Sequence, residues 1–298
     1  MTDRDLPRVA LIGPGAIGTT VAAALHQRGA TPLLAGRTPR TELRLDTSEG
    51  PVVVPGPVRT QPEDIRSPVD LVFLAVKATQ TAATAAWLRA LCGPETVVCV
   101  LQNGIEQEDA VAPLVPGRPV VPAVVWFPAV RGADDTVRLL AEARLTLPDV
   151  PTAAGIRDLL HGTRCAVDVT ADFRTIAWRK LLQNAVAGLM ALTGRRSGMF
   201  RRDDVGGLAR VYLEEGLAVA RADGANLDDT VIQQVLDGFR QVPADRGTSI
   251  LADREAGHPL EWSARNGVIQ RKGRALGVPT PVSDVVVPLL AAASDGPG

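Results

Sequence analysis

Three glycines near the start of the chain have the spacing of a phosphate-binding turn. Gly13, Gly15 and Gly18 follow directly after the apolar residues 9–12 in a G-x-G-x-x-G pattern. In such a turn the first glycine permits a tight bend, the second lets the backbone approach a pyrophosphate, and the third lets helix and strand pack closely. A helix starting at Ala16 and Ile17 would point its unpaired N–H groups and its dipole at that anion. The segment therefore predicts a dinucleotide-binding site.

Arg37 ends the next strand-like stretch, in the sequence Ala35-Gly36-Arg37. Domains that prefer NAD hold an acidic residue here, which bonds the ribose 2′-hydroxyl. A cation with no acid nearby favours a 2′-phosphate instead, and therefore NADP, with Thr38 and Arg40 as possible helpers. The alternative interpretation is a solvated loop arginine.

Polar residues also follow two later strand-like stretches. Lys77 and Gln80 come directly after the apolar residues 70–76, and Asn103 and Gly104 come directly after residues 96–101. Ligands of open parallel sheets bind at the carboxyl ends of strands, so these residues are candidates for contact with the cofactor. The alternatives are a surface lysine and an ordinary Asn-Gly turn.

A second set of candidates lies in the C-terminal half. Lys180 and Asn184 are four residues apart in an otherwise apolar helical pattern, so they share one helix face. Such a lysine either snorkels to water or faces a cleft. Ser249, Asp253 and Glu261 follow later, and their spacing alone is equally consistent with helix caps and solvated faces.

The elements that must position these residues change in character along the chain. Residues 1–171 alternate short β-rich stretches with helical ones, which predicts a doubly wound, Rossmann-type parallel sheet. Residues 172–298 show apolar residues at helical spacing, which predicts an all-helical domain. The expected strands cover 9–12, 31–35, 52–54, 58–60, 70–76, 96–101, 120–130 and 138–147, and the expected helices cover 16–28, 79–91, 173–192, 205–222, 228–241, 262–276 and 282–293.

Composition narrows the class of protein. The net charge of −1 and the 3% aromatic content argue against a nucleic-acid surface. Three distant cysteines in apolar surroundings, Cys92, Cys99 and Cys165, favour buried reduced thiols in a cytoplasmic protein without a metal site. The chain lacks a signal-peptide pattern and an apolar run long enough to cross a bilayer. The apolar helices at 205–222 and 282–293 could form a homodimer interface, or they could simply pack the helical core.

Taken in order, these motifs resemble the ketopantoate reductase (2-dehydropantoate 2-reductase) family nearly from end to end. The markers are the glycine turn, Val76-Lys77-Ala78, Gln102-Asn103-Gly104, Trp178-Arg179-Lys180 with Asn184, Ser249 with Asp253, Glu261, and Gly277-Val278-Pro279-Thr280-Pro281. The resemblance implies an NADP-dependent oxidoreductase that reduces a small 2-oxo acid, 2-dehydropantoate, to the 2-hydroxy acid pantoate with NADPH. It also implies that the site lies in the cleft between a Rossmann domain and a helical domain.

The resemblance further implies roles for individual residues. Lys180 would be the general acid, with Glu261 organising the site. Asn103, Asn184 and Ser249 would bind substrate. The cofactor would contact Gly13, Gly15, Ala16, Ile17, Gly18, Arg37, Lys77, Gln80 and Asn103.

Two places depart from the family pattern: Gly188, and residues 262–265 (Trp-Ser-Ala-Arg), which are bulkier and more basic than is usual after Glu261. Gly188 stands where a second substrate-binding asparagine is usual. The departures leave open a related reductase of a different 2-oxo acid, carbonyl or imine, and a non-catalytic NADP-binding protein is a further alternative.

Overall fold

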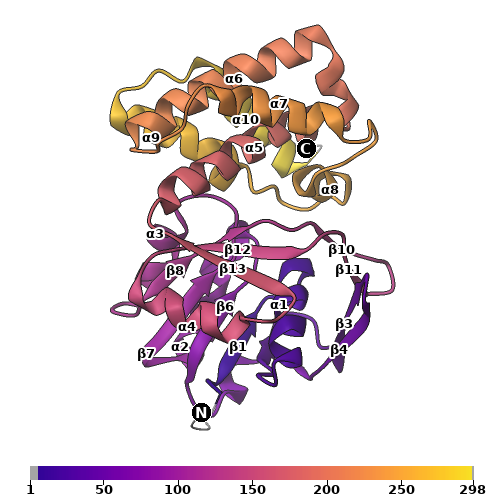
Figure 1. The fold of residues 1–298 in the computed structure, drawn as a ribbon, viewed down its shortest axis with the longest axis vertical. Helices are drawn as coiled ribbons and strands as arrows, with labels where there is room; N and C mark the ends of the chain where they lie inside the picture. The colour runs from indigo at the N-terminus through magenta and orange to yellow at the C-terminus, as the bar shows by residue number, and fades with distance from the viewer. Residues whose placement is uncertain (1–5, 297–298) are drawn as a thin grey trace. The chain divides into compact units, whose positions relative to one another are not determined.

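The computed structural model describes residues 6–296, which form two compact units (Figure 1). The first unit contains the chain up to residue 102 together with residues 107–173. The second contains residues 174 onward and, in addition, the short segment 103–106. Asn103 is therefore part of the helical unit, although the sequence analysis assigned all of residues 1–171 to the first domain.

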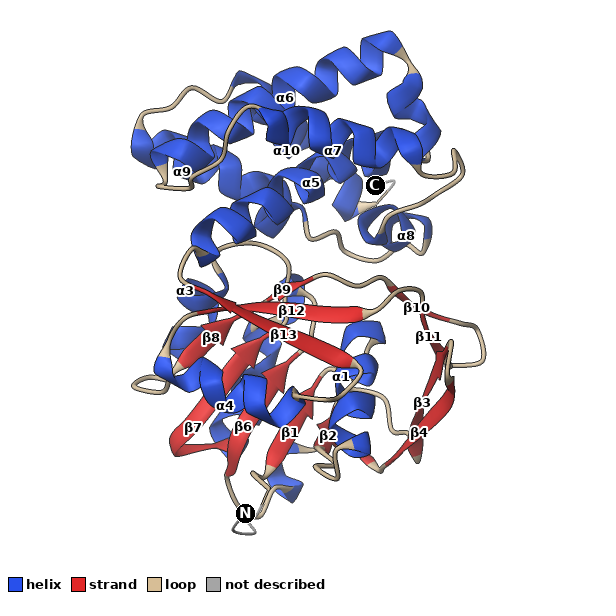
Figure 2. Ribbon diagram, in the orientation of Figure 1, coloured by secondary structure: helices blue, strands red, loops and turns tan. Residues whose placement is uncertain are grey.

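A six-stranded parallel sheet is the centre of the first unit (Figure 2). Its order is β5 (Val58–Arg59), β2 (Leu33–Ala35), β1 (Val9–Ile12), β6 (Val69–Leu74), β7 (Cys92–Val100) and β8 (Val120–Pro122). All of its strand pairs are parallel, which confirms the predicted Rossmann-type architecture. The chain continues from β1 to β2 on one side and places β6 on the other, so β1 marks the switch point at which such sheets bind ligands.

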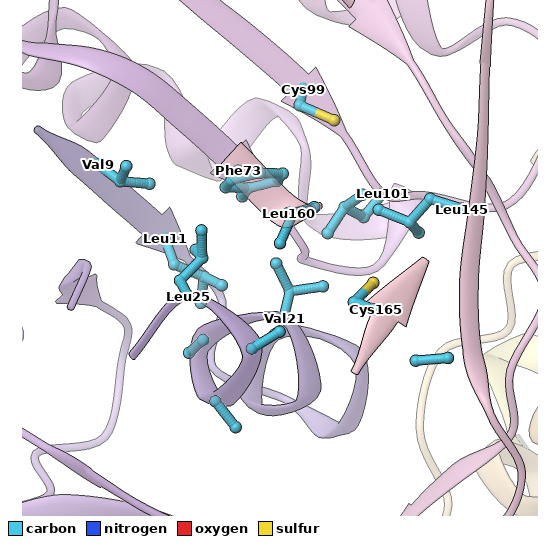
Figure 3. Close-up of a cluster of buried hydrophobic side chains, with 14 of the residues drawn as sticks. Val9, Leu11, Val21, Leu25, Phe73, Cys99, Leu101, Leu145, Leu160 and Cys165 are labelled. Carbon is cyan, nitrogen blue, oxygen red and sulfur yellow. The ribbon is translucent and has the colours of Figure 1, made fainter. Parts of the chain in front are cut away.

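Both faces of this sheet are covered because successive strand residues point to opposite sides. Leu11 and Phe73 pack in one buried cluster with Val21 of α1 (Ala16–Gln27) (Figure 3). Ile12 and Leu74 pack in another cluster with the short helix α2 (Ala85–Leu91) and with Val111 of α3 (Gln107–Val111). The near-continuous apolar strands are thus explained by burial on two faces.

Two smaller sheets accompany the main one, and the sequence analysis merged several of their strands. The first has the order β10 (Ala129–Arg131), β11 (Val137–Leu139), β3 (Glu42–Thr47) and β4 (Gly50–Pro55), and the second has the order β13 (Cys165–Thr170), β12 (Ala143–Pro148) and β9 (Val124–Val125). The predicted strand 120–130 was wrong as a single element, because it is divided among β8, β9 and β10. Pro122 and Pro128 lack the N–H group that a continuous ladder needs. The predicted strand 138–147 is likewise divided between β11 and β12.

Other local expectations also needed correction. The predicted helix 79–91 begins as the 3₁₀ turns η2 (Ala78–Gln80) and η3 (Ala82–Thr84), and only α2 is α-helical. The strands β3 and β13, the helices α3 and α4 (Pro151–Leu160), and the turns η1 (Pro62–Asp64) and η4 (Ala112–Leu114) were not predicted.

The second unit is helical, as predicted. Its elements are α5 (Phe173–Thr193), η5 (Ser197–Arg201), α6 (Asp203–Ala222), α7 (Thr230–Gln241), α8 (Ser249–Glu255), η6 (Ser263–Gly267), α9 (Val268–Leu276) and α10 (Pro281–Asp295). The predicted helix 262–276 starts with a π-helical turn, η6, before α9. Helix α8 was not predicted. Trp178, Phe200 and Tyr212 are among the largest fully buried side chains of this core.

A buried carboxylate ties α6 to the start of α10. Glu215 accepts hydrogen bonds from the backbone N–H groups of Val282, at 2.6 Å, and Ser283, at 2.9 Å. These N–H groups lie in the first helical turn, where they have no partner within the helix. Glu215 therefore stabilises the N-terminus of α10 through hydrogen bonds and through the helix dipole.

The cysteines are unpaired, but only two of them match the expectation of burial. Cys99 and Cys165 are buried in the first unit (Figure 3), whereas Cys92 is partly exposed. Burial raises the pKa of the Cys165 thiol to about 12 and that of Cys92 to about 11, so both stay protonated at neutral pH. Among residues 6–296, no helix combines the length and hydropathy that a bilayer crossing requires.

Candidate active site

The glycine turn has the geometry of a phosphate cradle. Gly13 has a φ of +90°, and a Cβ there would lie 2.6 Å from Cγ1 of Val76. At Gly18 a Cβ would collide with the carbonyl oxygen of Gly13. At Gly15, by contrast, an added Cβ meets no atom within 4 Å, so the backbone there faces open space at the N-terminus of α1. Each glycine thus meets the requirement of its position in a dinucleotide-binding turn.

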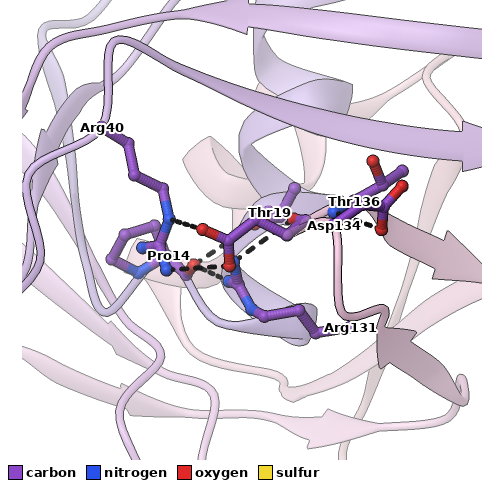
Figure 4. A network of polar contacts seen from close by, with 7 residues as sticks. Pro14, Thr19, Arg40, Arg131, Asp134 and Thr136 are labelled. Carbon is purple, nitrogen blue, oxygen red and sulfur yellow. Dashed lines mark hydrogen bonds and ion pairs between the residues drawn. The ribbon is translucent and has the colours of Figure 1, made fainter.

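An arginine from a distant strand braces this turn (Figure 4). The guanidinium of Arg131 in β10 donates to the carbonyl oxygen of Pro14, between the first two glycines. Arg131 and Arg40 both contact the carboxylate of Asp135, each at 3.0 Å, and their hydrogen bonds lower its pKa. One carboxylate is thus shared by two guanidinium groups, so the three side chains together keep a positive charge, and the role of Arg40 as a helper of Arg37 stays a prediction. A cavity of about 360 Å³ is lined by Arg40, Arg131 and Thr19 of α1, among others.

The other cofactor candidates of the first unit lie at the carboxyl ends of neighbouring strands. Arg37 comes just after β2 and is exposed, and among the described residues it has no ion-pair partner. Lys77 comes just after β6, and Gln80 lies in the turn η2 that follows. Ala16 and Ile17 form the first turn of α1. These residues and the open backbone at Gly15 are compatible with a bound dinucleotide.

The helical unit holds the second group of candidates on its longest helix, α5. Lys180 is partly buried, and Asn184, one turn later, is only 8% exposed. Desolvation, with a smaller contribution from the positive charge of Arg265, lowers the pKa of Lys180 to about 8. An amine with this pKa is mostly protonated at neutral pH and gives up its proton more readily than an ordinary lysine.

A chain of hydrogen bonds through Asn103, Glu261 and Arg265 joins Asn184 to Ser249. Asn184 Nδ2 donates to Asn103 Oδ1 at 3.2 Å, and Asn103 Nδ2 donates to Glu261 Oε2 at 3.1 Å. Arg265 Nη2 donates both to that same Glu261 oxygen, at 3.0 Å, and to Ser249 Oγ, at 2.9 Å. We call these five residues and Lys180 the polar cluster. It brings together Asn103, Lys180, Asn184, Ser249 and Glu261, all of which the sequence analysis selected for the substrate side.

Asp253 lies on α8, one turn after Ser249, and its side chain is 14% exposed. The described residues include no group of three His, Cys, Asp or Glu side chains that could hold a metal ion.

Arg265 is the member of the polar cluster that the sequence marked only as part of a basic departure from the family pattern and not as a site residue. Its side chain is only 2% exposed, and so is that of its ion-pair partner Glu261. The spacing of four residues between Glu261 and Arg265 was the available signal, because oppositely charged residues at that spacing meet on a helix. Burial could not be inferred, since arginine is among the residues most often exposed.

Gly188 lies on α5 where the chain departs from the expected pattern, and its surroundings are filled. A Cβ at this position would lie 2.7 Å from Asn266 Nδ2 and 3.1 Å from a methyl group of Leu290. Asn266 is completely buried and donates to Ala185 O, at 2.9 Å, and to the hydroxyl of Tyr212, at 3.0 Å. The amide of Asn266 thus occupies the space beside Gly188 within the core of the helical unit.

The chain is similar over nearly its whole length to one known family of proteins. The family model described as "Ketopantoate reductase PanE/ApbA" matches residues 9–152, and the model for the C-terminal part of the same family matches residues 172–294. A 2-dehydropantoate 2-reductase of Mycobacterium tuberculosis (strain H37Rv) is 58% identical over 97% of this chain and 99% of its own length. The chain belongs to the ketopantoate reductase family. This confirms the resemblance found in the sequence.

More distant ketopantoate reductases extend the comparison. A 2-dehydropantoate 2-reductase of Caulobacter vibrioides is 37% identical over 96% of this chain and 99% of its own. The solved structure of a dimeric ketopantoate reductase from Staphylococcus aureus has a TM-score of 0.88 and 28% identity, covering 98% of this chain and all of that one. As a member of the ketopantoate reductase family, the chain is a pyridine-nucleotide-dependent oxidoreductase, the class of enzyme that the sequence predicted.

Proposed function

We propose that the protein reduces 2-dehydropantoate to pantoate with NADPH, and that Lys180 is the general acid. The single observation that carries this proposal is the position of Lys180, a partly buried lysine with a pKa near 8 on the same helix face as Asn184. The 58% identity to a 2-dehydropantoate 2-reductase supports the choice of substrate.

The cofactor would be held by residues of the first unit. The backbone at Gly15 and the first turn of α1, with Ala16 and Ile17, suit the pyrophosphate. The exposed Arg37 suits a 2′-phosphate, which favours NADPH over NADH. Lys77, Gln80 and Asn103 are the remaining proposed contacts. When bound, the nicotinamide supplies the hydride that reduces the substrate.

Lys180 would act on the carbonyl oxygen of the substrate. As the carbonyl carbon gains a hydride, negative charge builds on this oxygen, and a positioned ammonium group stabilises that charge. Lys180 Nζ then donates its proton to the oxygen, which yields the hydroxyl group of pantoate. The lysine must be protonated at the start of each turnover, and its pKa of about 8 permits this at neutral pH.

The amides and the hydroxyl of the polar cluster would orient the substrate. Asn103, Asn184 and Ser249 are the proposed binding residues. Asn184 is bonded to Asn103, Asn103 to Glu261, and Ser249 to Arg265, and these hydrogen bonds orient the side chains before substrate arrives. Glu261 accepts hydrogen bonds from Asn103 and Arg265, so it organises the cluster.

The packing beside Gly188 bears on the alternative substrates. A glycine that enlarged the site would favour a bulkier acid, but the space next to Gly188 holds the side chain of Asn266. The reason for preferring another 2-oxo acid, carbonyl or imine is therefore weakened, and 2-dehydropantoate remains our proposed substrate.

We also propose that the protein is a cytoplasmic homodimer that associates through its helical unit. Apolar side chains are exposed at helical spacing on two helices, Leu208 and Val211 on α6 and Val285 and Leu289 on α10. Light scattering on the wild type and on a Leu289→Glu variant tests this proposal. A wild-type monomer would contradict it.

A screen of cofactors and substrates tests the proposed reaction. Oxidation of NADPH and of NADH is followed by absorbance with 2-dehydropantoate and with a panel of other 2-oxo acids. We expect the highest kcat/KM for NADPH with 2-dehydropantoate, and an Arg37→Ala variant that raises the KM for NADPH while leaving that for NADH nearly unchanged. Equal rates with generic 2-oxo acids would contradict the substrate, and equal use of both cofactors would contradict the role of Arg37.

A further inference from the structure

We propose that Arg265 makes the enzyme selective for substrates that carry a carboxylate next to the reacting carbonyl, by acting through the hydroxyl of Ser249. The inference rests on the proposed reduction of a 2-oxo acid and extends it to a residue for which the sequence analysis assigned no role. Three features of Arg265 carry it: its burial, the direction of its hydrogen bonds, and the charge that it adds to the polar cluster.

A buried guanidinium needs a reason in a core that apolar side chains could fill. Arg265 is 2% exposed, and its Nε is buried without a hydrogen-bond partner in the described part of the chain. Replacing buried ion pairs by well-packed apolar residues is often neutral or stabilising, so the pair of Arg265 and Glu261 is weak evidence for a purely structural role. Burying a charge costs free energy. That Arg265 is buried in the same cluster as the proposed general acid therefore favours a role in substrate recognition.

The hydrogen bond from Arg265 uses the Ser249 hydroxyl as an acceptor and leaves its proton for a ligand. A serine hydroxyl carries one proton and two lone pairs, and Ser249 Oγ accepts a hydrogen bond from Arg265 Nη2 at 2.9 Å. Because the guanidinium can only donate, the proton of the hydroxyl stays available for another acceptor. Ser249 is exposed while Arg265 is buried, so a ligand can reach the hydroxyl, whose oxygen is held by the guanidinium.

The charges within the polar cluster also favour an anion. Lys180 and Arg265 are its two cations, and Glu261 is its buried carboxylate. The charge of Arg265 reaches Lys180, since it contributes to lowering the pKa of that lysine. In a 2-oxo acid the carboxylate is bonded directly to the carbonyl carbon. A substrate whose carbonyl oxygen meets Lys180 therefore keeps its carboxylate nearby, and that carboxylate is assigned to the hydroxyl of Ser249, which Arg265 links to the same cluster.

The test compares an acid with its neutral counterpart. The lactone of 2-dehydropantoate keeps the ketone but lacks the carboxylate, so the ratio of the two kcat/KM values measures selectivity for the anion. The variants are Arg265→Met, which removes the charge at similar volume, Arg265→Lys, which keeps the charge, and Ser249→Ala. Arg274→Met is the matched control, because Arg274 is 69% exposed and pairs with Asp284 outside the polar cluster.

We expect Arg265→Met to lower kcat/KM for the acid about 10- to 100-fold, while that for the lactone changes less than about threefold. Arg265→Lys should retain most of the selectivity, Arg274→Met all of it, and Ser249→Ala should lose it as Arg265→Met does. Equal losses for both substrates in Arg265→Met or in Ser249→Ala would overturn the proposal. If Arg265→Met fails to fold, Ser249→Ala and Arg265→Lys still decide. If the wild type reduces neither 2-dehydropantoate nor its lactone, the proposed function itself is refuted. That outcome differs from equal losses in the variants, which refute only the role of Arg265.

Discussion

Replacing Gly188 tests whether this position is a close-packed contact or unused space. In the Gly188→Ala variant the new Cβ would lie 2.7 Å from Asn266 Nδ2 and 3.0 Å from Asn266 Oδ1. Both distances are shorter than an ordinary contact, so the amide of Asn266 must move. That amide is fully buried and holds Ala185 O and the hydroxyl of Tyr212.

Two opposing effects decide the stability of Gly188→Ala. Leaving a buried hydrogen-bonding group without its partner costs about 1–3 kcal/mol, and the displacement of Asn266 puts two such bonds at risk. Exchanging glycine for alanine inside a helix contributes about 0.8–1 kcal/mol in the favourable direction. With both bonds lost the first effect is larger, so we expect a net loss of about 1–5 kcal/mol in the free energy of unfolding. Each kcal/mol lowers Tm by about 2–4 °C in a protein of this size class.

Thermal and urea unfolding of Gly188→Ala measure this loss directly. The matched control is Gly207→Ala on α6, where an added Cβ meets nothing within 4 Å, and this variant should gain stability. If Gly188→Ala gained as much stability as Gly207→Ala, the space beside Gly188 would be open and the reasoning about Asn266 would be refuted.

Two further predictions concern the pH dependence of the reaction and the stability of helix α10. The reduction rate should fall as pH rises through about 8, because Lys180 loses its proton there; a rate that stays level to about pH 10, the range of an ordinary lysine, would contradict its desolvation. Glu215→Gln should lower the free energy of unfolding by about 1–3 kcal/mol in urea titrations, since it removes the charge that caps α10, while the exposed neighbour Glu214→Gln should be neutral. Equal stability of these two variants would contradict the claim that Glu215 stabilises the N-terminus of α10.

The parts of the fold that local sequence determines were predicted well. The glycine turn, β1 and α1 follow from one short stretch of residues, because turn geometry and helix start are encoded side by side there. Most of the long helices of the second unit followed from apolar spacing alone. Short strands such as β9 and β13 were missed or merged, since a strand of few residues is defined by the partner with which it pairs.

The polar cluster was predictable in its members but not in its connections. Lys180 and Asn184 share a helix face by spacing, and Asn103 and Glu261 could be selected as motif residues. Nothing in the sequence indicated that Asn103 joins the helical unit and bonds to both Asn184 and Glu261, because these contacts link residues 81 and 158 positions apart. The burial of Arg265 depends on the π-helical turn η6 and could not be read from periodicity.

The central claim is that Lys180 donates the proton to the carbonyl oxygen of 2-dehydropantoate. The most direct test compares turnover of 2-dehydropantoate and NADPH by the wild type and by Lys180→Ala, with NADPH binding followed in parallel by its fluorescence. We expect kcat to fall about 10²- to 10⁴-fold while the Kd for NADPH stays nearly unchanged. An unchanged kcat in Lys180→Ala would contradict the account.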